Sequence, residues 1–85
     1  MSPTTATLNR LGLKRQALAE LHHGLAPGCS LTLMGDGWTL RRRTGRQDVY
    51  GDVEELLEAL AAPGADWTAV ESPRAVVARV VRRVE

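Results

Sequence analysis

The sequence contains no phenylalanine, and its aromatic side chains are two tryptophans and one tyrosine. Its single cysteine, Cys29, excludes an intramolecular disulfide and a zinc site built from several cysteines. No apolar run is long enough to span a bilayer, and the N-terminal residues lack the basic and apolar regions of a secretory signal. We therefore expect a protein of a reducing cytoplasm that makes no contact with a membrane.

The chain is instead rich in leucine, valine and alanine. Its 85 residues are 44% hydrophobic and 25% charged, which is typical of one small globular domain. The net charge of +1 conceals a segregation, because segments 10–15, 41–46 and 74–83 are basic and segment 52–58 is acidic. This balance argues against general coating of nucleic acid and leaves a local basic patch possible.

Leucines near a period of 3.6 predict a helix over residues 6–23. The stripe consists of Leu8, Leu11, Leu18, Leu21 and Leu25. Gly12 lies inside this helix, where glycine is unfavourable. Gly24 is placed to adopt the left-handed conformation that ends a helix, and Pro27 prevents continuation.

The period changes to two between residues 29 and 50, which predicts three strands. Asp36-Gly37 and Thr44-Gly45 are typical of tight hairpin turns. The expected result is a three-stranded antiparallel meander.

Two-residue loops at both turns fix the register of the meander. Leu40 then lies between Leu33 and Val49, and Arg41 forms an opposite-charge pair with Asp48. The face expected under the helices comprises Leu31, Leu33, Trp38, Leu40 and Val49. The opposite, uncovered face comprises Thr32, Met34, Thr39, Arg41, Arg43, Asp48 and Tyr50.

Asp52 is a good N-cap for a helix over residues 52–62, with Glu55 in the position of a capping box. Segment 66–71 is either a short edge strand or a loop anchored by Trp67. The order of elements predicts a single α+β domain over residues 1–85, with two layers and the order α-β-β-β-α-α.

Ser72-Pro73 predicts the start of a helix over residues 73–84. Its valine density would also fit a strand, but the period and the cap favour a helix. Its valine stripe either packs in the monomer core or forms part of a homodimer interface. In the homodimer, Arg79 and Arg83 would flank acidic residues of the second chain.

The sequence offers little catalytic chemistry. His22 and His23 are adjacent, so on a helix they point about 100° apart and cannot chelate one metal ion in the i, i+4 manner. Cys29 has no evident electropositive pocket and is expected to be a small buried apolar residue. We expect a protein that is not an enzyme and has no cofactor and no metal site.

Residues 29–62 carry a basic strand, Arg41-Arg42-Arg43, ahead of a helix. This segment resembles the three-strand-plus-helix domains of plant AP2 factors and phage integrase arm-binding modules. The resemblance implies that Arg41, Arg43 and Thr39 read bases in a DNA major groove. The element order is also similar to double-stranded-RNA-binding domains, but Asp52 to Glu55 is acidic where that family has lysines.

In size and charge the chain resembles small phage-encoded anti-defence proteins, including anti-CRISPR proteins. That resemblance implies a non-enzymatic inhibitor, in the cytoplasm of a bacterial host, that occludes a surface of a protein or nucleoprotein complex. The acidic helix, Asp52 to Glu58, would then imitate nucleic-acid phosphates. The alternative is a small DNA-binding module. The residues expected to contact the partner are Met34, Thr39, Arg41, Arg43, Arg46, Tyr50, Glu54 and Glu58.

Overall fold

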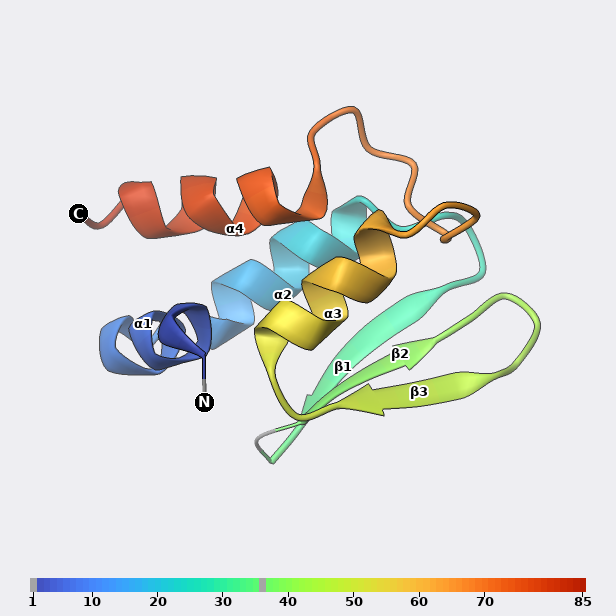
Figure 1. Cartoon of the computed structure of the whole chain (residues 1–85), viewed down its shortest axis with the longest axis horizontal. Coiled ribbons are helices and arrows are strands. Elements are labelled where there is room, and N and C mark those ends of the chain that lie inside the picture. The colour runs from blue at the N-terminus through green and yellow to red at the C-terminus, as the bar shows by residue number, and fades with distance from the viewer. Residues whose placement is uncertain (1, 36) are drawn as a thin grey trace.

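A computed structural model describes residues 2–35 and 37–85 and confirms the α+β class and the order of elements (Figure 1). The helices are α1 (Pro3–Leu11), α2 (Lys14–His23), α3 (Val53–Ala61) and α4 (Pro73–Arg82), and the strands are β1 (Ser30–Met34), β2 (Gly37–Arg41) and β3 (Gln47–Tyr50). The antiparallel sheet has the order β1-β2-β3. Asp36 of the predicted first turn lies outside the described residues. Across the two described ranges, no helix combines the length and apolar character that crossing a membrane requires.

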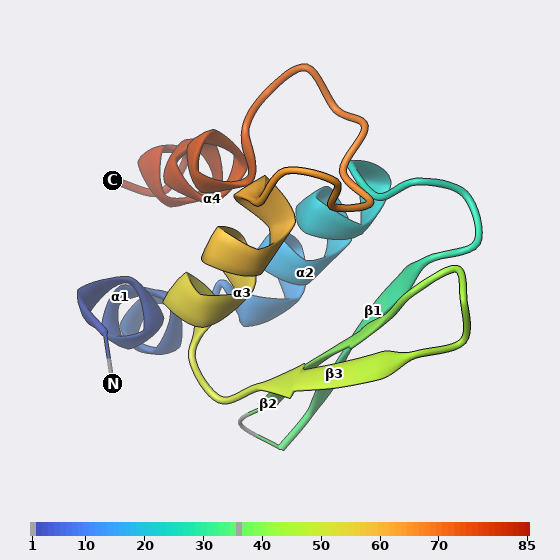
Figure 2. The same cartoon turned by 45° about the vertical axis from the view of Figure 1, so that its right-hand side comes forward.

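All four helices lie on the same side of the sheet (Figures 1 and 2). Helix α2 packs against β1, α3 packs against β3, and α4 contacts both α2 and α3. Trp38 and Leu40 of the central strand are buried beneath these helices, together with Leu21 of α2 and Leu56 of α3. Within the described residues, no element covers the other face of the sheet (Figures 1 and 2), as expected from a sequence with too few apolar residues to cover both faces.

The helix predicted over residues 6–23 is in fact two helices, because the chain turns at Gly12. Gly12 has a φ of 67°, and its N–H donates to the carbonyl oxygens of Leu8 and Asn9. This left-handed conformation ends α1 and is readily adopted only by glycine. Leu8 of α1 and Leu21 of α2 are therefore both buried, although they lie on separate helix axes.

Gly24 does not form the predicted left-handed cap, since its φ is −86°. A glycine is required there for a different reason, because the Trp67 ring occupies the space that a Cβ atom would fill. The indole N–H of Trp67 donates to the Glu71 carbonyl over 3.0 Å, and the Thr68 N–H donates to the Gly24 carbonyl over 2.8 Å. Segment 66–71 is thus a loop anchored by Trp67.

The second hairpin loop has three residues, 43–45, where two were predicted. The Arg42 N–H donates to the Arg46 carbonyl over 2.7 Å, and the Gly45 N–H donates to the Arg42 carbonyl over 2.9 Å. Gly45 has a φ of 93°, as in a type I turn followed by a glycine bulge. Leu40 therefore pairs with Asp48, one residue from its predicted partner Val49.

This shift of one residue exchanges the two faces of β3. The predicted placements of Asp48 and Tyr50 on the uncovered face and of Val49 under the helices are wrong. At the first hairpin, Met34 pairs with Gly37, so Leu40 pairs with Leu31 in place of Leu33. That shift is of two residues, so the predicted faces of β1 and β2 are retained.

The valine stripe of the last helix is largely used within the chain. Val76, Val77 and Val80 are buried, whereas Val84 is 53% exposed. Arg79 forms an ion pair of 2.9 Å with Glu71, so a contact expected across a dimer axis is made inside one chain.

The contact between Gly24 and Trp67 yields a prediction. Gly24→Ala places a methyl group inside the indole, and we expect it to lower the free energy of unfolding by about 1–3 kcal/mol. Gly51→Ala is the matched control, because a Cβ there meets nothing within 4 Å, and its effect should stay within about 1 kcal/mol. Urea unfolding followed by tryptophan fluorescence measures both; equal stability of the two variants contradicts the prediction.

Candidate functional site

The uncovered side of the sheet is here called the open face. The alternation of side chains along the three strands defines its residues. They are Ser30, Thr32, Met34, Gly37, Thr39, Arg41, Gln47 and Val49. None of these residues is acidic.

One end of the open face is apolar. Met34 of β1 is 72% exposed and Val49 of β3 is 71% exposed. Gly37 lies on the strand between them, and a Cβ atom there would be 3.4 Å from Cγ1 of Val49. Because glycine has no side chain, the two exposed residues border a shallow apolar strip at this end.

The other end of the open face is cationic. Arg41 is exposed at the end of β2, directly opposite Gln47. Arg43 and Arg46 follow in and after the hairpin loop, and both are exposed. Arg43 lies over the backbone of Gly28, where a Cβ would be 3.2 Å from its Cγ. Arg41 is thus the arginine that belongs to the open face itself.

Arg42 points the other way and has a structural role. Its Nε donates to Oδ2 of Asp48 over 2.9 Å, and its guanidinium also contacts the Tyr50 hydroxyl at 3.5 Å. The hydrogen bond from Arg42 lowers the pKa of Asp48, and Arg46 adds a second contact of 3.2 Å. The opposite-charge pair predicted for Arg41 and Asp48 is therefore made by Arg42.

The residues predicted to contact a partner fall on separate surfaces. Met34, Thr39 and Arg41 lie on the open face, whereas Tyr50 packs against the core on the helical side. Glu54 and Glu58 lie on α3, which is on the helical side of the sheet (Figure 2).

Sequence reasoning missed Gln47 and Val49 as open-face residues. Both follow from the three-residue loop, and the glycine at position 45 was the available signal. A loop ending in glycine is compatible with a bulge as well as with a two-residue turn.

The acidic segment at the start of α3 is partly committed to the fold. Asp52 accepts hydrogen bonds from Ser2 Oγ at 2.6 Å, Thr5 Oγ1 at 2.8 Å and the Glu54 N–H at 2.9 Å. The hydrogen bond from Ser2, together with that from Glu54, lowers the pKa of Asp52 well below its usual range. Asp52 is the predicted N-cap, with Ser2 and Thr5 as partners that the sequence did not indicate.

Glu54 is also engaged. It accepts from Thr4 Oγ1 over 2.9 Å and from the Arg74 guanidinium over 2.8 Å. Among the acidic residues of segment 52–58, Glu55 and Glu58 are exposed, whereas Asp52 and Glu54 are half-buried. Two exposed carboxylates of this segment are therefore available to imitate nucleic-acid phosphates.

The cysteine and the histidines are not brought together with further ligands. Cys29 is buried, and this burial raises the pKa of its thiol, with a further contribution from Asp66. His22 and His23 are exposed at the end of α2. Over residues 2–35 and 37–85, no three His, Cys, Asp or Glu side chains are grouped closely enough to hold a metal ion.

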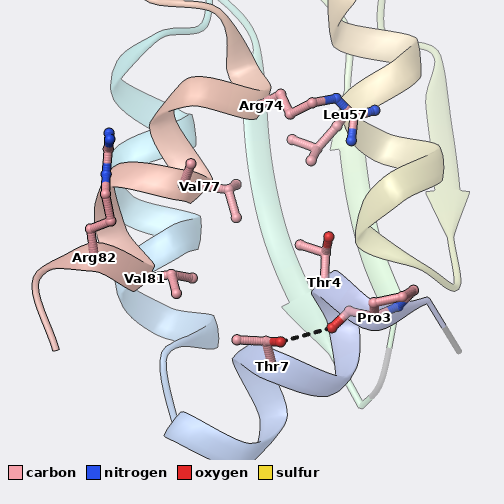
Figure 3. Close-up of a pocket in the computed structure, with 9 residues that line it drawn as sticks. Pro3, Thr4, Thr7, Leu57, Arg74, Val77, Val81 and Arg82 are labelled. Carbon is pink, nitrogen blue, oxygen red and sulfur yellow. Dashed lines mark hydrogen bonds between the residues drawn. The ribbon is translucent and has the colours of Figure 1, made fainter. Parts of the chain in front are cut away.

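A groove of about 370 Å³ lies between α1, α3 and α4 (Figure 3). Val77, Val81 and Leu57 form its aliphatic walls. Two of its polar side chains are used within the chain, because Thr7 Oγ1 donates to the Pro3 carbonyl over 2.9 Å (Figure 3) and Arg74 donates to Glu54 of α3. The groove is a hydrophobic seam where three helices meet.

Comparison of the chain with protein-family models, with curated proteins and with solved structures finds no match.

The lowered pKa of Asp52 predicts a pH dependence. An unfolded aspartate titrates near pH 3.9, so its stabilising charge is present above about pH 4 and is lost as the pH falls below that value. Asn is an equally good N-cap, so Asp52→Asn removes the charge and keeps the cap. We expect the variant to be less stable than the parent at pH 7, and the difference to shrink progressively below pH 4.

The control for this measurement is Glu58→Gln, which removes a charge from the exposed face of the same helix. Its unfolding free energy should remain close to that of the parent at each pH. Chemical denaturation at each pH measures these unfolding free energies. A difference in unfolding free energy between Asp52→Asn and the parent that stays constant from pH 7 to pH 2.5 would contradict the stabilising role of the Asp52 charge.

Proposed function

We propose that this protein is a non-enzymatic binding protein that occludes a surface of a macromolecular partner through the open face of its sheet. The observation that carries the proposal is the exposure of Met34 at 72% and Val49 at 71% at one end of the open face, with Arg41 at its other end and no described element covering it.

The composition of the open face supports a protein surface or a nucleoprotein complex as the partner. Methionine and arginine are enriched in protein interfaces, and carboxylates are depleted from their centres. The apolar strip between Met34 and Val49 is the part of the open face whose burial against a partner is most favourable in free energy. Arg41, at the other end, supplies bidentate hydrogen bonding to a carboxylate or a phosphate.

Inhibition by occlusion requires only a rigid surface of the right shape, which this domain can supply. Paired strands hold Met34, Thr39 and Val49 in fixed relative positions. The buried Trp38 and Leu40 fix the same strands from the helical side. Because Asp52 and Glu54 are engaged within the chain, we assign the contact to the open face rather than to the acidic helix.

Binding of duplex DNA is the second candidate, and one pairing favours it. Arg41 and Gln47 lie directly opposite each other on the open face. These side-chain types read guanine and adenine, respectively, in the major groove. Thr39 lies two residues before Arg41 on the same face of β2 and pairs with Val49. Its methyl group is available to contact the methyl group of thymine.

Four variants test the open face. In a lysate of the organism that encodes the chain, we expect the parent to retain a discrete protein partner after nuclease treatment. Met34→Asp and Arg41→Glu should each weaken that complex at least about ten-fold, since each places an adverse charge in the contact. Arg82→Glu, at the end of α4, and Val84→Asp, just after it, introduce the same charges at exposed positions away from the open face and should leave the complex unchanged.

Equal retention of the partner by Met34→Asp and by Val84→Asp would remove the open face from the proposal. Circular dichroism of each variant establishes that the fold is retained, as expected for exposed positions.

A salt titration separates the two candidates. If Arg41, Arg43 and Arg46 contact phosphates, the affinity for a random duplex should fall with a log–log slope of about −3 against salt concentration. Fluorescence anisotropy with a labelled duplex measures this slope. Absence of duplex binding at low salt excludes the DNA-binding candidate and leaves the protein-binding one.

A further inference from the structure

We infer that Gly37 forms the floor of a slot on the open face, between Met34 and Val49, and that this slot receives one aromatic side chain of a protein partner. Arg41, farther along the same strand, binds a carboxylate of that partner. The slot lies on the side of the sheet away from the four helices (Figure 2). The inference rests on the proposed function, because it names the groups that the open face recognises.

The fold itself does not require a glycine at position 37. In the first hairpin Gly35 has the left-handed conformation, with a φ of 60°, whereas Gly37 is already paired with Met34 in the sheet. A Cβ atom on Gly37 would be 3.4 Å from Cγ1 of Val49 and 3.5 Å from the Met34 carbonyl oxygen, which are ordinary contact distances. Glycine weakens a strand, and it often marks a place that another molecule approaches closely.

The slot has the width of one aromatic ring. The Cβ atoms of directly opposite strand residues lie about 5 Å apart, so Met34 Cβ and Val49 Cγ1 are separated by about 8 Å across the missing Cβ of Gly37. Carbon atoms in contact are about 3.5–4.0 Å apart, so a ring with one wall against each of its faces fills this width. A branched aliphatic side chain is thicker than a ring and would stand higher above the floor.

The two walls are also chemically suited to a ring. The thioether of a methionine such as Met34 makes favourable contacts with aromatic rings, and Val49 adds an aliphatic surface. Neither wall side chain is a hydrogen-bond donor, and a nucleobase would lose its bonds to water here without replacement. The slot therefore favours the ring of a protein side chain over a nucleobase.

A second copy of this chain does not supply the ring. The aromatic residues of the chain are Trp38, Tyr50 and Trp67. Trp38 is fully buried, and Tyr50 and Trp67 pack against the core. The occupant is therefore a different protein.

Arg41 defines the second group of the partner. It lies four residues after Gly37 on the same face of β2, about 13 Å along the strand. No described residue of the open face is acidic, so a carboxylate for Arg41 comes from the partner. The partner thus presents a ring and a carboxylate about 13 Å apart, which is the spacing of residues i and i+4 on one side of an extended segment.

A blocked pentapeptide reproduces this spacing and serves as the probe. It has phenylalanine first, glutamate fifth and threonines between them. In ¹³C-methyl spectra of the protein, the ring current of the bound phenylalanine should move the methyl signals of Met34 and Val49 upfield. The signals of Val70 and Val84, which are exposed elsewhere, should stay in place.

Two altered peptides test the selection of the ring and of the carboxylate. Leucine in place of phenylalanine should weaken binding about five-fold, because the contacts specific to a ring are lost. Lysine in place of glutamate should weaken it at least about ten-fold, because a like charge then faces Arg41.

Variants of Gly37 separate binding from stability. Gly37→Val fills the slot and should weaken binding of the pentapeptide at least about ten-fold. The midpoint of its urea unfolding should equal or exceed that of the parent, since valine is favoured in strands. Gly37→Ala, the smaller change, should weaken binding at least about three-fold. Arg41→Glu should weaken it about ten-fold, whereas the control Arg82→Glu should alter it less than about two-fold.

Four results overturn the inference. The first is no shift of the Met34 and Val49 methyl signals at the highest soluble concentration of the pentapeptide. The second is equal binding of the phenylalanine and leucine peptides, and the third is unchanged binding by Gly37→Val. The fourth is tighter binding of an oligothymidylate than of the pentapeptide with the same methyl signals shifted, because that result assigns the slot to a nucleobase.

The complex retained from the lysate distinguishes failure of this inference from failure of the proposed function. If Met34→Asp weakens that complex and Gly37→Val leaves it unchanged, the slot is overturned and the open face stands as the contact surface. If both variants leave it unchanged, the proposed function fails as well.

Discussion

A single carboxylate, that of Asp52, holds the first residues of the chain against the segment that begins α3. It accepts hydrogen bonds from the backbone N–H and the hydroxyl of Ser2, while also capping α3 through the Glu54 N–H. Thr5, a further donor to Asp52, accepts in turn from the Val53 N–H over 3.1 Å. The start of α1, the end of β3 and the start of α3 meet at this point, so the orientation of α3 on the sheet depends on it.

The small size of the domain explains why it has so much uncommitted surface. A chain of 85 residues has a thin core, and here the aliphatic side chains are gathered on one side of the sheet. The other face of the sheet and the outer edge of β1 are left uncovered. The charges are distributed accordingly, because Glu20, Asp48 and Glu54 are all engaged by arginines on the helical side. The open face keeps Arg41 without a carboxylate among its own described residues.

The fold could be predicted from the sequence wherever the deciding interaction is local. The N-caps Asp52 and Ser72 are examples, because a cap is a bond to a backbone N–H only a few residues away. The contact of Trp67 with Gly24 joins distant segments, so no local pattern reveals it. The open face was predicted correctly for β1 and β2 and wrongly for β3, since Gly45 is compatible with loops of two and of three residues.

The pair of residues that closes the second hairpin decides which side of β3 belongs to the binding surface. Closure by Arg42 and Arg46 places Val49 on the open face. Closure by Arg43 and Arg46, around a two-residue turn, would reverse the two sides of β3 without altering any residue of the strand. Val49 would pass beneath the helices, and Asp48 would emerge beside Arg41, converting a cationic surface into a mixed one. In this architecture a change of turn type has the effect of several simultaneous substitutions, so the residues of one short loop govern the chemistry of a whole strand.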